Sequence, residues 1–171
     1  MATTTARFEE LSALELGAWR GLLRVHSALV RELDAELEAA HGLPLSSYDV
    51  LIYLRSAPDK RLRMAELADS VLLSRSGMTR LVDRLVREGL IVRDTCESDG
   101  RGSFAVLTDA GEALLARARP THLAGVRERF LGQFSEAELR AVARLWERVV
   151  PGSTDLMDGE GDAQAIEGAA A

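Results

Sequence analysis

The hydrophobic pattern between Ser46 and Leu107 changes once, from a helical period to a strand period, and this change limits the folds open to the chain. Up to Gly89, apolar residues recur at helical spacing, most clearly in the set Met78, Leu81, Val82 and Leu85. Two short apolar runs follow, at residues 90–93 and 104–107, with a polar segment between them. The pattern therefore predicts a group of short helices followed directly by a β-hairpin.

Three short helices are expected in this segment. Ser46 or Ser47 opens the first helix, which is broken before Pro58. The second helix runs from Met64 to Leu72, and Ser74 caps the third. Short helices with tight connections, followed by a hairpin, form the arrangement of a winged helix-turn-helix.

A much longer amphipathic stretch precedes this segment, from about Phe8 to Ala40. Its apolar residues recur every seven positions, as at Leu11, Ala18 and Val25, and Gly42 is a typical residue to end such a helix. A helix of about 30 residues cannot bury its apolar stripe against one small domain. We therefore expect it to pack against a partner helix or a second subunit.

Two further helices are expected after the hairpin. Thr108 caps the first, which reaches about Phe134 with an irregularity near Pro120. Ser135 and Glu138 have the spacing of a capping box and open the second.

The net charge of −6 is unevenly distributed along the chain. Residues 151–171 hold five acidic residues, no basic residue and few large apolar ones, so we expect this acidic tail to be disordered. Residues 60–93 hold eight basic and four acidic residues, a local excess of four positive charges. A basic surface of this kind indicates an anionic partner. The alternative is that these arginines only occupy solvated helix faces.

The third short helix carries the groups that a DNA-reading helix needs. Its first turn is small and polar, which suits an N-terminus that enters the major groove with backbone N–H groups facing phosphate. Either Arg75 or Arg80 could make a bidentate contact with guanine. The candidate DNA-contacting residues of this helix are Ser74, Arg75, Ser76, Thr79, Arg80 and Arg84. The alternative is a basic amphipathic helix at a protein interface.

The segment between the two strands places one arginine, Arg101, at the tip of the hairpin. Asp99 can accept a hydrogen bond from the Arg101 guanidinium and hold it extended, and a single arginine at such a tip suits a narrow minor groove. The alternative is an ordinary Asp-Gly turn at Asp99 and Gly100. Cys96, the only cysteine, lies in the same hairpin, and we interpret it as an incidental thiol.

Four segments carry a family resemblance: residues 73–85, residues 89–91, Asp99 with Arg101, and the run Leu107-Thr108-Asp109-Ala110-Gly111. Together they resemble the MarR family of bacterial transcriptional regulators, over about residues 8–150. The resemblance implies a homodimer, a palindromic operator in double-stranded DNA, and release from that DNA when a small ligand binds. The DNA-contacting positions of the family match Ser74, Ser76, Thr79, Arg80 and Arg101.

With this resemblance, the expected fold is mainly α with a small β-wing: a winged helix-turn-helix domain plus a helical dimerisation domain. Residues 1–42 form the N-terminal dimerisation helix and residues 43–108 form the DNA-binding lobe. Residues 109–150 form the C-terminal dimerisation helices, and residues 151–171 form the acidic tail. We interpret the chain as a homodimeric repressor of its own and neighbouring promoters.

Many members of the family respond to phenolic or other aromatic anions, bound between the dimerisation helices and the DNA-binding lobe. An aromatic wall, a cation for a carboxylate and a hydrogen-bonding histidine suit such a ligand. The candidate residues here are Trp19, Arg20, His26, Tyr48 and Asp49. The alternative is that the aromatic residues pack at an interface and the polar ones form a solvated face.

Other patterns argue against a membrane protein, an enzyme or a metalloprotein. No apolar run can span a bilayer and the first ten residues lack the apolar core of a signal peptide, so we expect a cytoplasmic protein. Residues 100–105 have the letters of a dinucleotide fingerprint but precede a strand. His26, His41 and His122 lack metal-ligand spacing, so we expect neither metal nor cofactor. Two alternatives remain: an adaptor that binds an acidic protein through its arginine face, and a small-molecule-binding protein without a DNA function.

Overall fold

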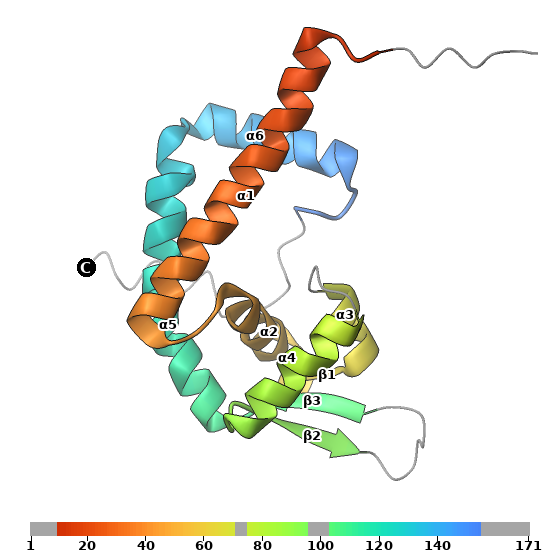
Figure 1. Cartoon of the computed structure of the whole chain (residues 1–171), viewed down its shortest axis with the longest axis vertical. Coiled ribbons are helices and arrows are strands. Elements are labelled where there is room, and N and C mark those ends of the chain that lie inside the picture. The colour runs from red at the N-terminus through yellow and green to blue at the C-terminus, as the bar shows by residue number, and fades with distance from the viewer. Residues whose placement is uncertain (1–9, 71–74, 96–102, 155–171) are drawn as a thin grey trace, which may run out of the picture.

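The computed structural model of the chain describes residues 10–70, 75–95 and 103–154. In these ranges the elements are α1 (Ala13–His41), α2 (Leu45–Ser56), β1 (Arg61–Arg63), α3 (Met64–Ser70), α4 (Arg75–Arg87), β2 (Ile91–Thr95), β3 (Ser103–Leu107), α5 (Asp109–Arg129) and α6 (Glu136–Val149). Figure 1 shows the long helices α1, α5 and α6 as a frame, with α2, α3, α4 and the strands beside it as a smaller lobe. The predicted fold class, mainly helical with a small β-wing, is confirmed.

Helix α1 has a typical capping residue at each end, Ser12 before its first turn and Gly42 after its last. Ser12 forms a capping box with Glu15: the Glu15 backbone N–H donates to Ser12 Oγ at 3.3 Å, and the Ser12 N–H donates to Glu15 Oε2 at 2.8 Å. Gly42 ends the helix in the left-handed conformation, with φ of 62°. The predicted length is nearly right, but the start near Phe8 is wrong, because residues 10–12 are not helical.

The core of the lobe is built by α2, α3, α4 and the sheet, with fully buried side chains such as Leu54, Leu67, Val82 and Ile91. Neither Ser46 nor Ser47 caps α2, because Pro44 occupies the N-cap position and the helix begins at Leu45. Ser47 instead lies inside the helix and, among the described residues, is the one polar side chain buried in this core.

The predicted hairpin is confirmed as strands β2 and β3, and a third strand, β1, joins it. The sheet is antiparallel throughout, in the order β1-β3-β2. Its register aligns Arg63 with Phe104 and Phe104 with Asp94. The sequence did not predict β1, because three residues with a single apolar side chain give no strand period.

Helix α5 continues through Pro120, where an irregularity was expected, and ends at Arg129 instead of Phe134. A short 3₁₀ turn at Leu131–Gln133 separates it from α6. The predicted capping box at the start of α6 is confirmed: the Ser135 N–H donates to Glu138 Oε2 at 2.8 Å.

The first turn of α5 lies close against the lobe. Thr108 caps this turn, because its Oγ1 accepts from the Gly111 N–H at 3.1 Å. Gly111 is buried, and a Cβ at this position would collide with the carbonyl oxygen of Leu90 and lie 2.8 Å from Leu107 Cδ1. The Leu-Thr-x-x-Gly run noted in the sequence thus allows α5 to approach the lobe backbone directly.

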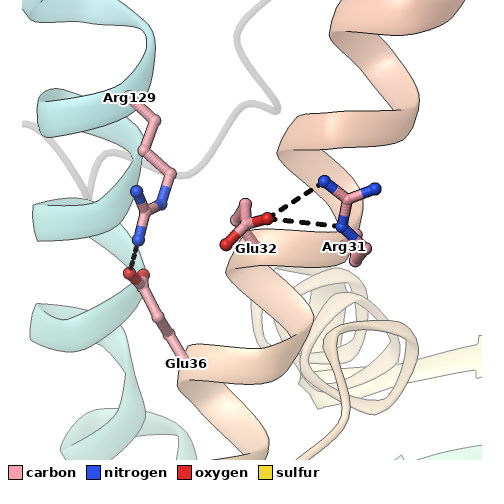
Figure 2. A network of polar contacts seen from close by, with 4 residues as sticks. All are labelled: Arg31, Glu32, Glu36 and Arg129. Atoms are coloured by element: carbon pink, nitrogen blue, oxygen red, sulfur yellow. Dashed lines mark hydrogen bonds and ion pairs between the residues drawn. The ribbon is translucent and has the colours of Figure 1, made fainter.

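Further along, α5 packs against the C-terminal half of α1. Gly125 allows this approach, since a Cβ there would lie 2.5 Å from Glu36 Oε2 and 2.7 Å from Leu33 Cδ2. Figure 2 shows the ion pair of this interface, in which the Arg129 guanidinium of α5 donates to the Glu36 carboxylate of α1. This hydrogen bond and the neighbouring glutamates raise the pKa of Arg129, so its guanidinium stays charged. Helix α5 is therefore shared by the frame and the lobe.

Candidate nucleic-acid interface

Helix α4 has one side in the core of the lobe and one side exposed. Met78, Val82 and Leu85 are buried, whereas Thr79 and Arg80 are exposed. This alternation follows the helical spacing predicted from the sequence, and it leaves a polar and basic face on the outside of the lobe. Two of the predicted DNA-contacting residues, Thr79 and Arg80, lie on this face.

Of the other predicted DNA-contacting residues, the structure describes Arg84 in full, the backbone of Arg75 and Ser76, and none of Ser74, Asp99 and Arg101. The backbone of Arg75 and Ser76 forms the first turn of α4. Ser74, Asp99 and Arg101 lie outside the described residues, as does Cys96. The wing tip and the cap of α4 therefore remain sequence predictions.

Arg84 is directed toward α2. Its Nη2 donates a hydrogen bond to the buried Oγ of Ser47, and its Nε lies 3.9 Å from Glu88 Oε1. The side chain is half-buried, unlike those of Thr79 and Arg80. In this position Arg84 supports the packing of α4 on α2, a role that the sequence alone did not indicate.

A second ion pair joins α4 to the wing. The Arg93 guanidinium of β2 donates to Asp83 Oδ1 of α4 at 2.7 Å. Both side chains are partly exposed, so the pair contributes at most about 1 kcal/mol to stability. It nevertheless links β2 of the hairpin directly to α4. Sequence reasoning missed this pair because it depends on how the hairpin packs against the helix.

The outer face of the sheet carries a cation–π cluster. The Arg61 Cζ lies 4.0 Å from the centroid of the Phe104 ring, and the Arg63 Cζ lies 4.8 Å from it. Arg61 Nη1 also lies 3.7 Å from Asp94 Oδ2 on β2. The local excess of basic residues noted in the sequence is thus partly committed to contacts within the wing.

The five predicted ligand-binding residues do not form one cluster within a single chain. Trp19, Arg20 and His26 are exposed on α1. Tyr48 and Asp49 lie in α2, just beyond the other end of α1. At 1.5 Å per residue, Trp19 lies about 30 Å along α1 from the turn that leads to α2. A site that contains all five residues requires a second chain or a different set of contacts.

The two α2 residues of this set lie in distinct environments. Tyr48 is buried, and its ring contacts His122 of α5. Asp49 is half-buried, and no described residue forms a hydrogen bond or ion pair with its carboxyl group. Burial without a partner raises the pKa of Asp49 to about 6. Buried histidines and carboxyls of this kind are common at binding sites.

The described residues contain no group of three or more His, Cys, Asp or Glu side chains suited to hold a metal ion. Over the same residues, no helix combines the length and the apolar character needed to cross a membrane.

Comparisons with known proteins place this geometry in a family context. A model of the MarR family matches residues 41–102. A Bacillus cereus protein described as an uncharacterized HTH-type transcriptional regulator is 31% identical over 131 residues, which cover 77% of this chain and 85% of that protein. The Bacillus subtilis HTH-type transcriptional regulator MhqR is 31% identical over 109 residues, covering 64% of this chain and 73% of that protein.

Two solved structures from Streptomyces coelicolor are similar over most of the chain. Sco3205, a MarR family transcriptional regulator crystallised in complex with DNA, is 34% identical with a TM-score of 0.78, covering 86% of this chain and 97% of Sco3205. AbsC, a MarR family transcriptional regulator, is 29% identical with a TM-score of 0.77, covering 94% of this chain and 99% of AbsC. These relatives are regulators, which agrees with the motifs and the lobe geometry described above.

Proposed function

Because this chain belongs to the MarR family of transcriptional regulators, we propose that it binds double-stranded DNA in a sequence-specific manner and represses transcription from its own and neighbouring promoters. The observation that carries the proposal is the exposed basic face of α4 on a lobe that also carries a hairpin wing. The 34% identity to Sco3205, which was crystallised with DNA, supports it.

In this proposal α4 lies in the major groove. Ser74, Arg75 and Ser76 approach the DNA with the first turn of the helix, and Thr79 and Arg80 contact base edges or phosphates from its exposed face. Arg101, oriented by Asp99, reaches the minor groove at the wing tip. Arg84 holds the helix against α2 through Ser47.

We further propose that the chain acts as a homodimer. Large apolar side chains are exposed on α1 and α6, far from the lobe core: Leu14, Trp19, Leu22, Leu23, Val25, Leu145, Trp146 and Val149. Exposed apolar patches of this extent on helices typically mark an interface. Two-fold symmetry then pairs two α4 helices about 34 Å apart, so the operator is expected to be palindromic.

Derepression is proposed to follow the binding of a small aromatic anion between the frame and the lobe. In the dimer, α1 of one chain could bring Trp19, Arg20 and His26 toward a pocket that includes Tyr48 and Asp49. The dimer would have two states, one whose α4 helices are spaced to fit the operator and one whose α4 helices are not. A ligand that binds the second state more tightly weakens DNA binding, at most by the ratio of its affinities for the two states.

A gel-shift titration tests the proposed function. The probe is the DNA upstream of the gene that encodes this chain, with random DNA as competitor, at two salt concentrations. We expect tight, salt-sensitive binding that survives the competitor. If random DNA displaces the probe as well as unlabelled probe DNA does, sequence-specific regulation is contradicted. If no binding is seen at either salt concentration, the protein-binding adaptor is favoured. Aromatic acids added to the bound complex then test ligand release.

A further inference from the structure

The outer face of the three-stranded sheet presents side chains from all three strands. Register and the two-residue period of strands place six residues on this face: Arg61, Arg63, Val92, Asp94, Phe104 and Val106. The opposite face faces the core, as the burial of Ile91 and Ala105 shows. The side chains of the outer face lie outside this core, and cross-strand contacts join several of them.

Arg61 makes the contacts that span this face. Its guanidinium carbon lies 4.0 Å from the centroid of the Phe104 ring, and its Nη1 lies 3.7 Å from Asp94 Oδ2. Because β3 lies between β1 and β2, the Arg61 side chain crosses the central strand to reach Asp94. The pair of Phe104 and Asp94 adjoins the last pair of the sheet, Thr95 with Ser103.

The main chain before Arg61 has an uncommon conformation. Asp59 and Lys60 have φ angles of 55° and 54°, a left-handed conformation that persists in non-glycine residues only where surrounding contacts hold it. Lys60 Nζ donates to Glu112 Oε2 of α5 at 2.6 Å. Lys60 and Arg61 are neighbours in the chain, so β1 and the residue before it connect the first turn of α5 to both strands of the hairpin.

We propose that Arg61 is a positioning residue for DNA binding: stacked on Phe104 and paired with Asp94, it holds the base of the wing so that the wing tip meets the DNA in a fixed orientation. The inference rests on the proposed function. A two-stranded hairpin has little stability alone, and β1 adds only three residues of backbone pairing. The inner face of the hairpin packs on the core and Arg93 pairs with Asp83 of α4, and the side-chain contacts across the outer face add to this support. A rigid wing loses less entropy on binding.

The test combines single and double variants in the gel-shift titration described above. Arg61→Ala removes the Arg61 contact with the ring and the ion pair with Asp94 but leaves Arg63 over the ring. Phe104→Leu removes the ring but keeps every charge. Both are expected to weaken operator binding about three- to tenfold, given the usual strength of cation–π contacts and partly exposed ion pairs. Arg31→Ala, which removes an arginine paired with Glu32 on α1, is the control and should bind like the wild type.

A double-mutant cycle with Arg101→Ala separates positioning from direct contact. If Arg61 acts through the wing tip, the double variant binds no more weakly than Arg101→Ala alone. If Arg61 itself contacts phosphate, the two losses add, the salt dependence falls further in the double variant, and Phe104→Leu binds like the wild type. Additive losses, or wild-type binding by Arg61→Ala, would overturn the positioning role.

Failure of the proposed function is distinguishable from failure of this inference. A wild-type chain that does not discriminate operator from random DNA overturns both. A wild-type chain that discriminates, with Arg61→Ala binding equally well, overturns the positioning role alone. Amide hydrogen exchange at Val92 and Val106 serves as a readout without DNA: we expect faster exchange in Arg61→Ala and Phe104→Leu than in the wild type.

Discussion

The ring of Tyr48 in α2 lies against the imidazole of His122 in α5, with 4.5 Å between the ring centroids and a tilt of 37°. Tyr48 is buried, and the His122 Nδ1 atom is buried without a hydrogen-bond partner among the described residues. The contact therefore joins the lobe to the frame through a partly buried histidine. Burial lowers the pKa of His122, which gives the contact a defined dependence on pH.

The first prediction concerns this histidine. Because the pKa of His122 is lower in the folded chain than in the unfolded chain, the unfolded chain binds more protons below about pH 6.5, the ordinary histidine value. The stabilising effect of neutral His122 is thus complete above that pH and is lost as the pH falls toward the folded-state pKa. Urea unfolding of the wild type and His122→Gln between pH 5 and 8 measures this. The variant should lose less stability on acidification, and equal slopes would contradict the assignment.

Asp49 is predicted to act in the opposite direction. Its pKa is raised to about 6, so the folded chain binds more protons than the unfolded chain between the ordinary aspartate value and pH 6. The folded state is consequently penalised above pH 6, where the half-buried carboxyl must ionise. Asp49→Asn should raise the free energy of unfolding at pH 7.5 by about 1 kcal/mol, after allowance for partial exposure, and by less at pH 5. A variant that is less stable at pH 7.5 would indicate a partner for the carboxylate.

Gly111 is predicted to be intolerant of any side chain. Alanine normally stabilises a helix interior by about 1 kcal/mol relative to glycine. At Gly111, however, the added methyl group meets the backbone carbonyl of Leu90, which cannot move without displacing the start of β2. Gly111→Ala should therefore destabilise the chain by about 1–3 kcal/mol, measured by thermal unfolding. Gly17→Ala in α1 is the matched control, because nothing lies within 4 Å of its added Cβ, and it should not destabilise.

The proposed dimer interface predicts a difference between two equally exposed valines. Val25 on α1 is 50% exposed, and Val92 on the outer face of the wing is 48% exposed. An aspartate buried in an apolar interface is costly, whereas the same aspartate on an exposed surface is not. Sedimentation equilibrium should show Val25→Asp shifted toward monomer at micromolar concentration and Val92→Asp still dimeric. A wild type that sediments as a monomer would overturn the dimer itself.

Replacing Arg80 and replacing Arg101 are predicted to weaken DNA binding in different ways. Arg80→Ala should weaken operator binding by about 1–3 kcal/mol and reduce the preference for operator over random DNA, as expected for a base contact. Arg101→Ala should weaken operator and random DNA together. Competition gel shifts with both variants measure the ratio of the two affinities. The same loss of preference in both variants would remove this division of roles.

Local signals in the sequence predicted those elements whose formation depends on neighbours in the chain. The capping box at Ser135 and Glu138, the helical spacing of α4 and the cap at Gly42 are of this kind, and all are confirmed. Ser46 and Ser47 carried the same local signal, but the helix begins at Leu45, whose backbone N–H donates to Asp34 Oδ1 of α1 at 2.8 Å. Ser47 lies inside the helix and accepts a hydrogen bond from Arg84.

Contacts that depend on tertiary register could not be predicted. The stack of Arg61 on Phe104 joins residues more than forty positions apart, and its strand β1 forms only where β3 provides an edge to pair with. The candidate ligand residues show the same limit, because the sequence does not indicate how they are arranged in space: Trp19 lies near the N-terminal end of α1, whereas Tyr48 lies in α2, beyond its C-terminal end.

Helix α5 has two places of close packing, one against the lobe and one against the frame. Near its first turn Gly111 is packed against Leu90 of the lobe, and near its last turn Gly125 is packed against α1 of the frame. The two contacts are 14 residues apart, about 21 Å along the helix, so a tilt of about 8° at the frame moves the lobe by about 3 Å. That displacement is close to the spacing of one base pair along DNA, about 3.4 Å. Small adjustments where α1 meets α5 are thereby enlarged to the scale on which a DNA groove is read.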